Sequence, residues 1–329
     1  MSSMISAAKD SASERWQILR EKLPWSRVKQ VLTLIFFALV AYLLVNQASE
    51  IEWAKVWETL KQTSPVTLLI GLALGFACFC VYASYDLFGR YLLKLDVSVI
   101  KVWFAAWLSY AFNLNLSSLV GGVAFRYRLY SRLGIKASDV TRILGISIAT
   151  NWLGYILLAG GLFVSGQINP PDSWAVGTLA LQIIGAVFLV VVAAYVLLCW
   201  RATKREYQFK SVTVTLPRVN IALLQLLVAC AHWTLMASVI YQFLADDVAF
   251  PTVFAVLLVS ALAGVITHIP GGLGVLEAVF VALLAGQADK TTILAGLFAY
   301  RCVFYLAPLA VATPLYLMFE AATRHKKSA

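Results

Sequence analysis

The sequence predicts an all-α polytopic membrane protein, and three observations lead to that class. Of its 329 residues, 61% are hydrophobic and only 13% are charged, whereas a soluble domain carries about 25% charged residues. Uncharged apolar stretches of bilayer-spanning length recur along the whole chain. Lysine and arginine lie mainly in the short segments between those stretches, which is the placement that membrane orientation favours. The net charge of +10 is therefore assigned to topology, and no nucleic acid is expected as a partner.

The apolar stretches predict one membrane domain over residues 28–320, between an N-terminal segment, 1–27, and a tail, 321–329. The first stretch is followed by no signal-peptidase type of site, so we expect a retained span. The eight stretches are 28–47, 65–88, 99–120, 138–165, 176–200, 220–244, 252–286 and 291–320.

Loop charges indicate that two of these stretches do not cross. If each crossed once, the Arg- and Lys-rich loops 121–137 and 201–219 would lie outside, against the positive-inside rule. If 99–120 and 252–286 each dip in and return, every loop obeys the rule. We therefore predict about six full transmembrane helices plus two re-entrant helical hairpins, with both termini cytoplasmic. An ordinary polar-tipped span over 99–120 is the alternative.

The same two stretches contain helix-breaking residues. Open backbone survives at membrane depth only where protein or a wet cavity satisfies it. The first stretch carries Asn113 and Asn115 ahead of Gly121 and Gly122, and the second carries Pro270, Gly271, Gly272 and Gly274. Helix breakers and loop charges are independent observations, and both select the same two hairpins.

The predicted topology also contains an inverted repeat. Residues 65–165 and 220–320 each read as span, hairpin, span, and they enter the membrane from opposite sides. This interpretation depends on hydropathy and charge, because residue identity between the halves is negligible. In secondary transporters such a repeat indicates a binding site near the midplane, between the two broken elements.

Ionisable residues inside apolar stretches are costly in a membrane and are candidates for function. Glu277 and Arg301 relieve that cost if they pair with each other or if each binds substrate. His268 precedes the second break and is either a candidate ligand or a packing residue. Asp86 shares a helix face with Arg90, four residues on, so we expect those two to pair.

Arg126 and Arg128 follow the first break. Arginine beside opened backbone suits a phosphate headgroup through paired, charge-assisted hydrogen bonds, and a solvated cytoplasmic face is the alternative. The five cysteines show no metal-ligand spacing, and no nucleophile constellation or nucleotide-binding motif is present. We therefore expect no metal, no cofactor and no enzymatic activity.

At these residues the sequence resembles a known family. Gly121-Gly122 with Arg126, the run 270–274 with Glu277, and Tyr300-Arg301 are similar to the lysylphosphatidylglycerol synthase transmembrane region. That region is the flippase-like domain of the multiple peptide resistance factor. The full factor adds a soluble domain that transfers lysine from tRNA to phosphatidylglycerol, and no such segment follows here. The resemblance thus implies lipid translocation and not lipid aminoacylation. One departure is that 117–122 reads SSLVGG, without the proline and the following acidic residue that the family pattern has.

These observations favour a lipid translocase of a bacterial plasma (inner) membrane. Arg126, Arg128 and Arg301 are expected to bind the phosphate of a phospholipid headgroup in a polar groove between the hairpins, with Glu277 bound to a cation or a proton. Asn113, Asn115 and His268 are also expected to contact the substrate. The alternative is a non-transporting lipid-binding partner of a phospholipid (for example cardiolipin) synthesis enzyme. An intramembrane transferase is a third, less supported reading. The identity of the lipid and the oligomeric state stay open.

Overall fold

The computed structural model describes residues 38, 42, 53–116, 122–166, 177–209, 212–244, 247–267 and 274–325. The chain divides into two units, Met1–Ile51 and Glu52–Ala329, and all described residues except Ala38 and Tyr42 belong to the second. The predicted first span, 28–47, falls in the first unit and lies outside the described residues except for Ala38 and Tyr42, which are helical.

Within the described part of the second unit the fold is almost entirely helical, as predicted. The elements of its first half are α3 (Trp53–Gln62), α4 (Pro65–Ala83), α5 (Tyr85–Leu92), α6 (Val99–Asn115), α7 (Phe125–Arg132), α8 (Ala137–Val164) and α9 (Thr178–Arg201). Those that follow are β1 (Glu206–Phe209), β2 (Val212–Thr215), α10 (Val219–Tyr241), α11 (Phe250–Thr267), α12 (Val275–Leu283), α13 (Lys290–Arg301), the π-helical η3 (Cys302–Leu306) and α14 (Ala307–His325).

Five helices in the described residues are long and apolar enough to cross a membrane. They are Pro65–Leu92, Ala137–Val164, Thr178–Arg201, Val219–Tyr241 and Lys290–Ala322. Each coincides with a predicted crossing, and the sixth predicted crossing is the stretch 28–47. The class of multi-pass, all-α membrane protein is confirmed, while the total of six crossings and the side of each terminus stay predictions.

The stretch 99–120 supplies only the first arm of a hairpin, because its returning arm α7 lies in the predicted loop 121–137. Helix α6 has 17 residues, which is about 25 Å at 1.5 Å per residue and shorter than a hydrocarbon core of about 30 Å. Helix α7 then runs back along it: Tyr130 Oη lies 3.4 Å from the Val102 carbonyl oxygen, and Phe112 stacks on Phe125 at 4.0 Å between centroids. The C-terminal end of α6 therefore lies beside the N-terminal end of α7. That this hairpin re-enters a bilayer stays a prediction.

Gly122 allows the close approach at the start of the returning helix. A Cβ atom there would lie 2.5 Å from Asn113 Oδ1, so the Asn113 amide would have to move. The glycine predicted to belong to the hairpin backbone thus lets the Asn113 side chain lie directly against it. Gly121 lies outside the described residues.

The second hairpin consists of α11 and α12, which pack against each other. Helix α12 begins after Gly274, whose φ of 78° lies in the left-handed region that glycine adopts without strain. His268, Pro270, Gly271 and Gly272 fall in the connection and lie outside the described residues.

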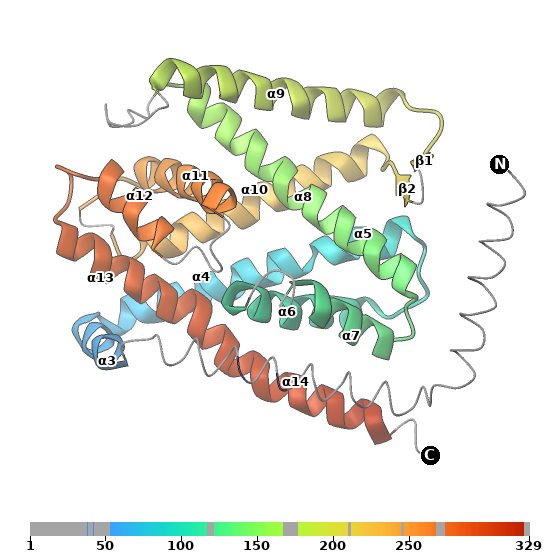
Figure 1. Ribbon diagram of the computed structural model, residues 1–329, viewed down its shortest axis with the longest axis horizontal. Helices are drawn as coiled ribbons and strands as arrows, with labels where there is room; N and C mark the ends of the chain where they lie inside the picture. The colour runs from blue at the N-terminus through green and yellow to red at the C-terminus, as the bar shows by residue number, and fades with distance from the viewer. Residues whose placement is uncertain are drawn as a thin grey trace, which may run out of the picture. The chain divides into compact units, whose positions relative to one another are not determined.

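The last predicted span is one continuous helix with a π turn inside it. Helix α13 ends at Arg301, η3 follows, and α14 continues from Ala307. Pro308 has no N–H to donate to the turn before it, which favours an irregular turn at this point. In Figure 1 these three elements form the long red helix at the lower edge of the picture.

The order of elements repeats as the hydropathy predicted. Helices α4–α5, the α6–α7 hairpin and α8 are followed, after α9 and the β-strands, by α10, the α11–α12 hairpin and α13–α14. Helix α8 packs against α5, α9 and α10 and so joins the two sets (Figure 1). The opposite membrane orientation of the two sets stays a prediction. The segment 201–219, which the sequence indicated only as a polar loop, contains the antiparallel pair β1–β2.

Candidate membrane-embedded polar site

The two hairpins converge on the π turn of the last long helix. Asn115, the final residue of α6, donates from Nδ2 to the Tyr305 carbonyl in η3 at 3.1 Å. The guanidinium carbon of Arg301 lies 5.3 Å from the centroid of the Tyr305 ring, a cation–π arrangement. Arg301 in turn binds Glu277 of α12. Residues from both hairpins therefore meet around Arg301 and Tyr305.

Glu277 and Arg301 form a two-point ion pair. Arg301 Nε donates to Glu277 Oε1 at 2.6 Å, and Arg301 Nη2 donates to Oε2 at 3.1 Å. The Gly274 N–H also donates to Oε2, at 2.9 Å, so the carboxylate caps the start of its own helix. The two side chains remain 23% and 13% exposed. The sequence placed these two charges in one site, and the structure pairs them while leaving part of each accessible.

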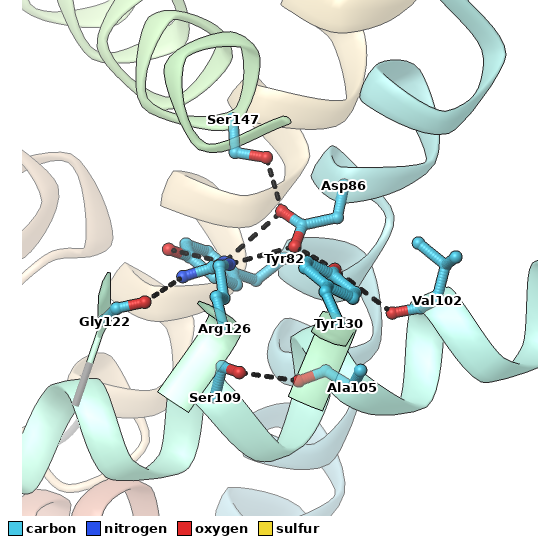
Figure 2. Close-up of polar contacts among 9 residues, drawn as sticks. All are labelled: Tyr82, Asp86, Val102, Ala105, Ser109, Gly122, Arg126, Tyr130 and Ser147. Atoms are coloured by element: carbon cyan, nitrogen blue, oxygen red, sulfur yellow. Dashed lines mark hydrogen bonds and ion pairs between the residues drawn. The ribbon is translucent and has the colours of Figure 1, made fainter. Parts of the chain in front are cut away.

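Arg126 lies in a different and fully enclosed network, shown in Figure 2. Its Nε donates to Asp86 Oδ2 at 2.9 Å and its Nη2 to Oδ1 at 3.3 Å. The hydroxyls of Tyr130 on α7 and Ser147 on α8 donate to the same carboxylate. The side chains of Arg126 and Asp86 are 3% and 0% exposed, so Arg126 offers no open face to a headgroup in this geometry.

The expected pair of Asp86 with Arg90 is wrong. Arg90 Nε instead donates to the Val97 carbonyl in the turn that follows α5. A buried carboxylate needs several donors to offset its desolvation, and Asp86 obtains them from the facing helices α7 and α8 and not from its own. Arg126 also donates to the Gly122 carbonyl at 3.4 Å, which ties the start of the returning helix to the same network (Figure 2).

Arg128 also binds a carboxylate, on the other side of α7. Its Nη2 donates to Glu320 Oε1 at 2.8 Å, and Arg132 donates to the same oxygen. Glu320 belongs to α14 and is almost fully buried. Helix α7 is therefore held by Asp86 of α5 on one side and by Glu320 of α14 on the other.

Of the residues predicted to bind substrate, the structure brings three together. Asn115, Glu277 and Arg301 surround the π turn, while Asn113 packs against Gly122 and the arginines of α7 bind carboxylates elsewhere. Asn115 also donates to the Ala111 carbonyl at 2.9 Å. Among the residues described, no three His, Cys, Asp or Glu side chains gather in a way that could hold a metal ion.

Sequence reasoning missed Tyr305 and Glu320. Glu320 is an acidic residue in the last apolar stretch, and the rule that flagged Glu277 would have flagged it as well. Tyr305 carried no comparable signal, because it acts through its backbone carbonyl and its ring in a π turn that sequence periodicity does not show.

The fold and site define a multi-pass membrane protein with paired charges on broken helices. The chain matches the family model described as lysylphosphatidylglycerol synthase TM region over residues 30–312, and it belongs to that family.

Three relatives show how far the similarity extends. The chain is 43% identical to inner membrane protein YbhN of Escherichia coli (strain K12), over 90% of this chain and 94% of that protein. It is 27% identical to the Synechocystis sp. protein slr0712, over 82% of this chain and 84% of that one. It is 25% identical to phosphatidylglycerol lysyltransferase of Staphylococcus haemolyticus, over 87% of this chain but only 33% of that enzyme.

Proposed function

We propose that this protein moves a phosphate-bearing lipid headgroup across the inner membrane, and that Glu277 and Arg301 bind the headgroup. The observation that carries the proposal is the convergence of both hairpins on the π turn beside this accessible ion pair. Membership of a family named for a lipid-modifying enzyme's membrane region supports a lipid as the substrate.

The chemistry of the pair suits a headgroup. The guanidinium of Arg301 presents a planar fork that matches a phosphate, and Glu277 can accept a cationic group or a proton. When the pair is closed, each charge neutralises the other inside the membrane. A phosphate that reaches Arg301 would take the place of the Glu277 carboxylate. Arg301 would then be neutralised by the phosphate when substrate is bound and by Glu277 when it is not.

Arg126 and Arg128 have a different role in this proposal. Both are paired with carboxylates that are almost fully buried, whereas the Glu277 partner of Arg301 is 23% exposed. In this proposal Arg126 and Arg128 therefore position the first hairpin. Asn115 at the end of that hairpin then contributes to the site through its bond to the Tyr305 carbonyl.

The test is translocation of a fluorescently labelled phosphatidylglycerol in proteoliposomes that contain the purified protein. Arg301→Ala and Glu277→Gln are expected to abolish entry of the label into the protected leaflet while the protein stays folded. Asp289→Asn, an exposed acid at the start of the same helix, is the matched control and is expected to transport normally. Unchanged transport in both site variants would sink the assignment.

A charge swap separates binding from stability. Glu277→Arg combined with Arg301→Glu keeps an ion pair in the membrane but exchanges the positions of its two charges. We expect the double variant to fold and yet not to transport. If the wild-type protein binds phosphatidylglycerol but never moves it, the alternative of a non-transporting lipid-binding partner replaces this proposal.

A further inference from the structure

The β1–β2 hairpin follows directly on the end of the membrane-spanning helix α9. In its register Glu206 lies opposite Thr215, and Tyr207 lies opposite Val214. Because successive side chains of a strand point to opposite faces, these two pairs belong to opposite faces of the hairpin. One pair is polar and the other is apolar.

One residue of α8 contacts the polar face. Arg142 donates from Nη2 to Thr215 Oγ1 at 2.7 Å, and the same nitrogen lies 3.9 Å from Glu206 Oε1. Glu206 stays 69% exposed and Gln208 is exposed as well, so this face is held at Thr215 and is otherwise open to water.

The base of the hairpin is firmly fixed. Arg205 Nη1 donates to the carbonyls of Cys199 and Pro217 at 2.8 and 2.9 Å. Leu216 donates its N–H to the Arg205 carbonyl at 2.7 Å and is buried in a small core with Cys199 and Ala222. The hairpin is therefore held at its base and by the bond from Arg142 to Thr215.

The apolar face is uncovered. Tyr207 is 41% exposed and Val214 is 51% exposed. The chain enters the hairpin from the end of α9, where Leu197, Leu198 and Trp200 are also exposed, as expected for a helix surrounded by lipid. An exposed apolar face that continues from a lipid-facing helix end indicates lipid as its neighbour.

The charges around the hairpin are complementary to an anionic lipid surface. Between residues 201 and 219 the sequence has five Arg and Lys side chains (Arg201, Lys204, Arg205, Lys210 and Arg218) and one acidic side chain, Glu206. Arg201, Lys204 and Arg218 are exposed, and Lys204 Nζ lies 6.0 Å from the centroid of the Tyr207 ring. Aromatic and basic residues together are the composition that membrane interfaces favour.

We propose that the β1–β2 hairpin lies in the headgroup layer of the bilayer that surrounds α9, with Tyr207 and Val214 inserted among lipid and with Arg201 and Lys204 on the phosphates of anionic phospholipids. The hairpin is thus an anchor and a sensor of anionic lipid at one membrane surface. This inference is independent of lipid translocation, and it holds or fails on its own test.

The first test measures the depth of each face. A spin label is attached to cysteine in Tyr207→Cys, Val214→Cys or, as the matched control on the opposite face, Gln208→Cys, after replacement of the five native cysteines. In phosphatidylglycerol-containing nanodiscs we expect labels at 207 and 214 to be accessible to oxygen and shielded from an aqueous nickel reagent, with the reverse at 208. Equal aqueous accessibility at 207 and 208 overturns the proposal. Shielding from both reagents with spin–spin broadening indicates a second copy as the occupant and also overturns it.

The second test needs no cysteine replacement. Hydrogen exchange of residues 204–216 in the full-length protein is compared between nanodiscs of phosphatidylcholine alone and nanodiscs with added phosphatidylglycerol. We expect the anionic lipid to slow exchange several-fold, and Arg201→Gln with Lys204→Gln to remove that slowing. Lys94→Gln with Lys101→Gln, which removes two exposed charges elsewhere, is expected to leave it unchanged. Exchange that is indifferent to phosphatidylglycerol overturns the recognition of anionic lipid.

Discussion

Each hairpin carries one member of an ion pair just after its break, Arg126 in the first and Glu277 in the second, and the two pairs are built in contrasting ways. Asp86 and Arg126 are fully enclosed, and their carboxylate receives four hydrogen bonds from side chains of α7 and α8 (Figure 2). Glu277 and Arg301 are partly exposed, and the carboxylate receives bonds from Arg301 and from the backbone of its own hairpin. The network of the first pair links α5, α7 and α8, whereas the second pair links α12 and α13 and leaves part of each side chain exposed.

The difference between the pairs assigns them different roles. A buried ion pair whose partners are all satisfied fixes the position of the elements that carry it, and removing one partner leaves an uncompensated charge. A partly exposed pair costs less to open and can exchange one partner for a ligand. Charge inside a membrane is therefore a signal of function only after its exposure is known.

The largest expected effect follows from removing the buried carboxylate. Asp86→Asn leaves the Arg126 charge unpaired, and we expect it to lower the free energy of unfolding by about 3–5 kcal/mol. Denaturant titration or thermal unfolding of the purified protein in detergent measures the loss. Glu277→Gln is expected to change stability far less, because its partner stays partly exposed.

A second substitution provides the control for that result. Arg126→Met added to Asp86→Asn removes the stranded charge and is expected to recover most of the lost stability. If Asp86→Asn lowers the free energy of unfolding no more than Glu277→Gln does, the contrast between an enclosed structural pair, Asp86–Arg126, and a pair that can open, Glu277–Arg301, is wrong.

An intermediate effect is expected at the start of α12. Gly274→Ala forces a side chain into the left-handed region at φ 78° and is expected to cost about 1–2 kcal/mol. Gly134→Ala, at φ 82° in the turn between α7 and α8, carries the same strain away from Glu277. We expect similar melting temperatures for the two variants but impaired translocation only for Gly274→Ala. Equal transport by both variants would show that translocation does not depend on the backbone conformation at Gly274.

The smallest effect is expected from removing one donor of the enclosed pair. Ser147→Ala deletes one of the hydroxyls bound to Asp86 and is expected to cost about 1 kcal/mol. Arg126 and Tyr130 continue to hold the carboxylate. A loss as large as that of Asp86→Asn in the same unfolding assay would show that Ser147 and not Arg126 dominates the network.

Much of the fold could be predicted from sequence because a bilayer imposes simple rules. Hydropathy alone located the long helices to within a few residues, as the stretch 138–165 and the observed Ala137–Val164 illustrate. Loop charges predicted a turn-back near 99–120, and α6 does end at Asn115, but the returning helix α7 lies at Phe125–Arg132, in the predicted loop. Hydropathy and loop charge can each be read from a short stretch of sequence, so neither prediction required knowledge of how the helices pack.

Partner choice was harder to predict, because it depends on distant contacts. Asp86 is 40 residues from Arg126 and only four from Arg90, and spacing on one helix favoured the nearer arginine. The strands β1 and β2 have four residues each, too few for a periodic pattern within a basic segment. The pairing of Glu277 with Arg301 was predictable because two unlike charges in apolar stretches have few other ways to be satisfied.

The π turn changes the angle between Arg301 and Glu320 around the axis of the last helix. Arg301 and Glu320 are 19 residues apart, and at about 100° per residue an unbroken α-helix would turn them to faces about 100° apart. A π turn absorbs one extra residue, and the remaining 18 steps make about five whole turns. The two residues then lie on the same side of the helix. One continuous helix can therefore pair Arg301 with Glu277 of the second hairpin and Glu320 with the arginines of the first.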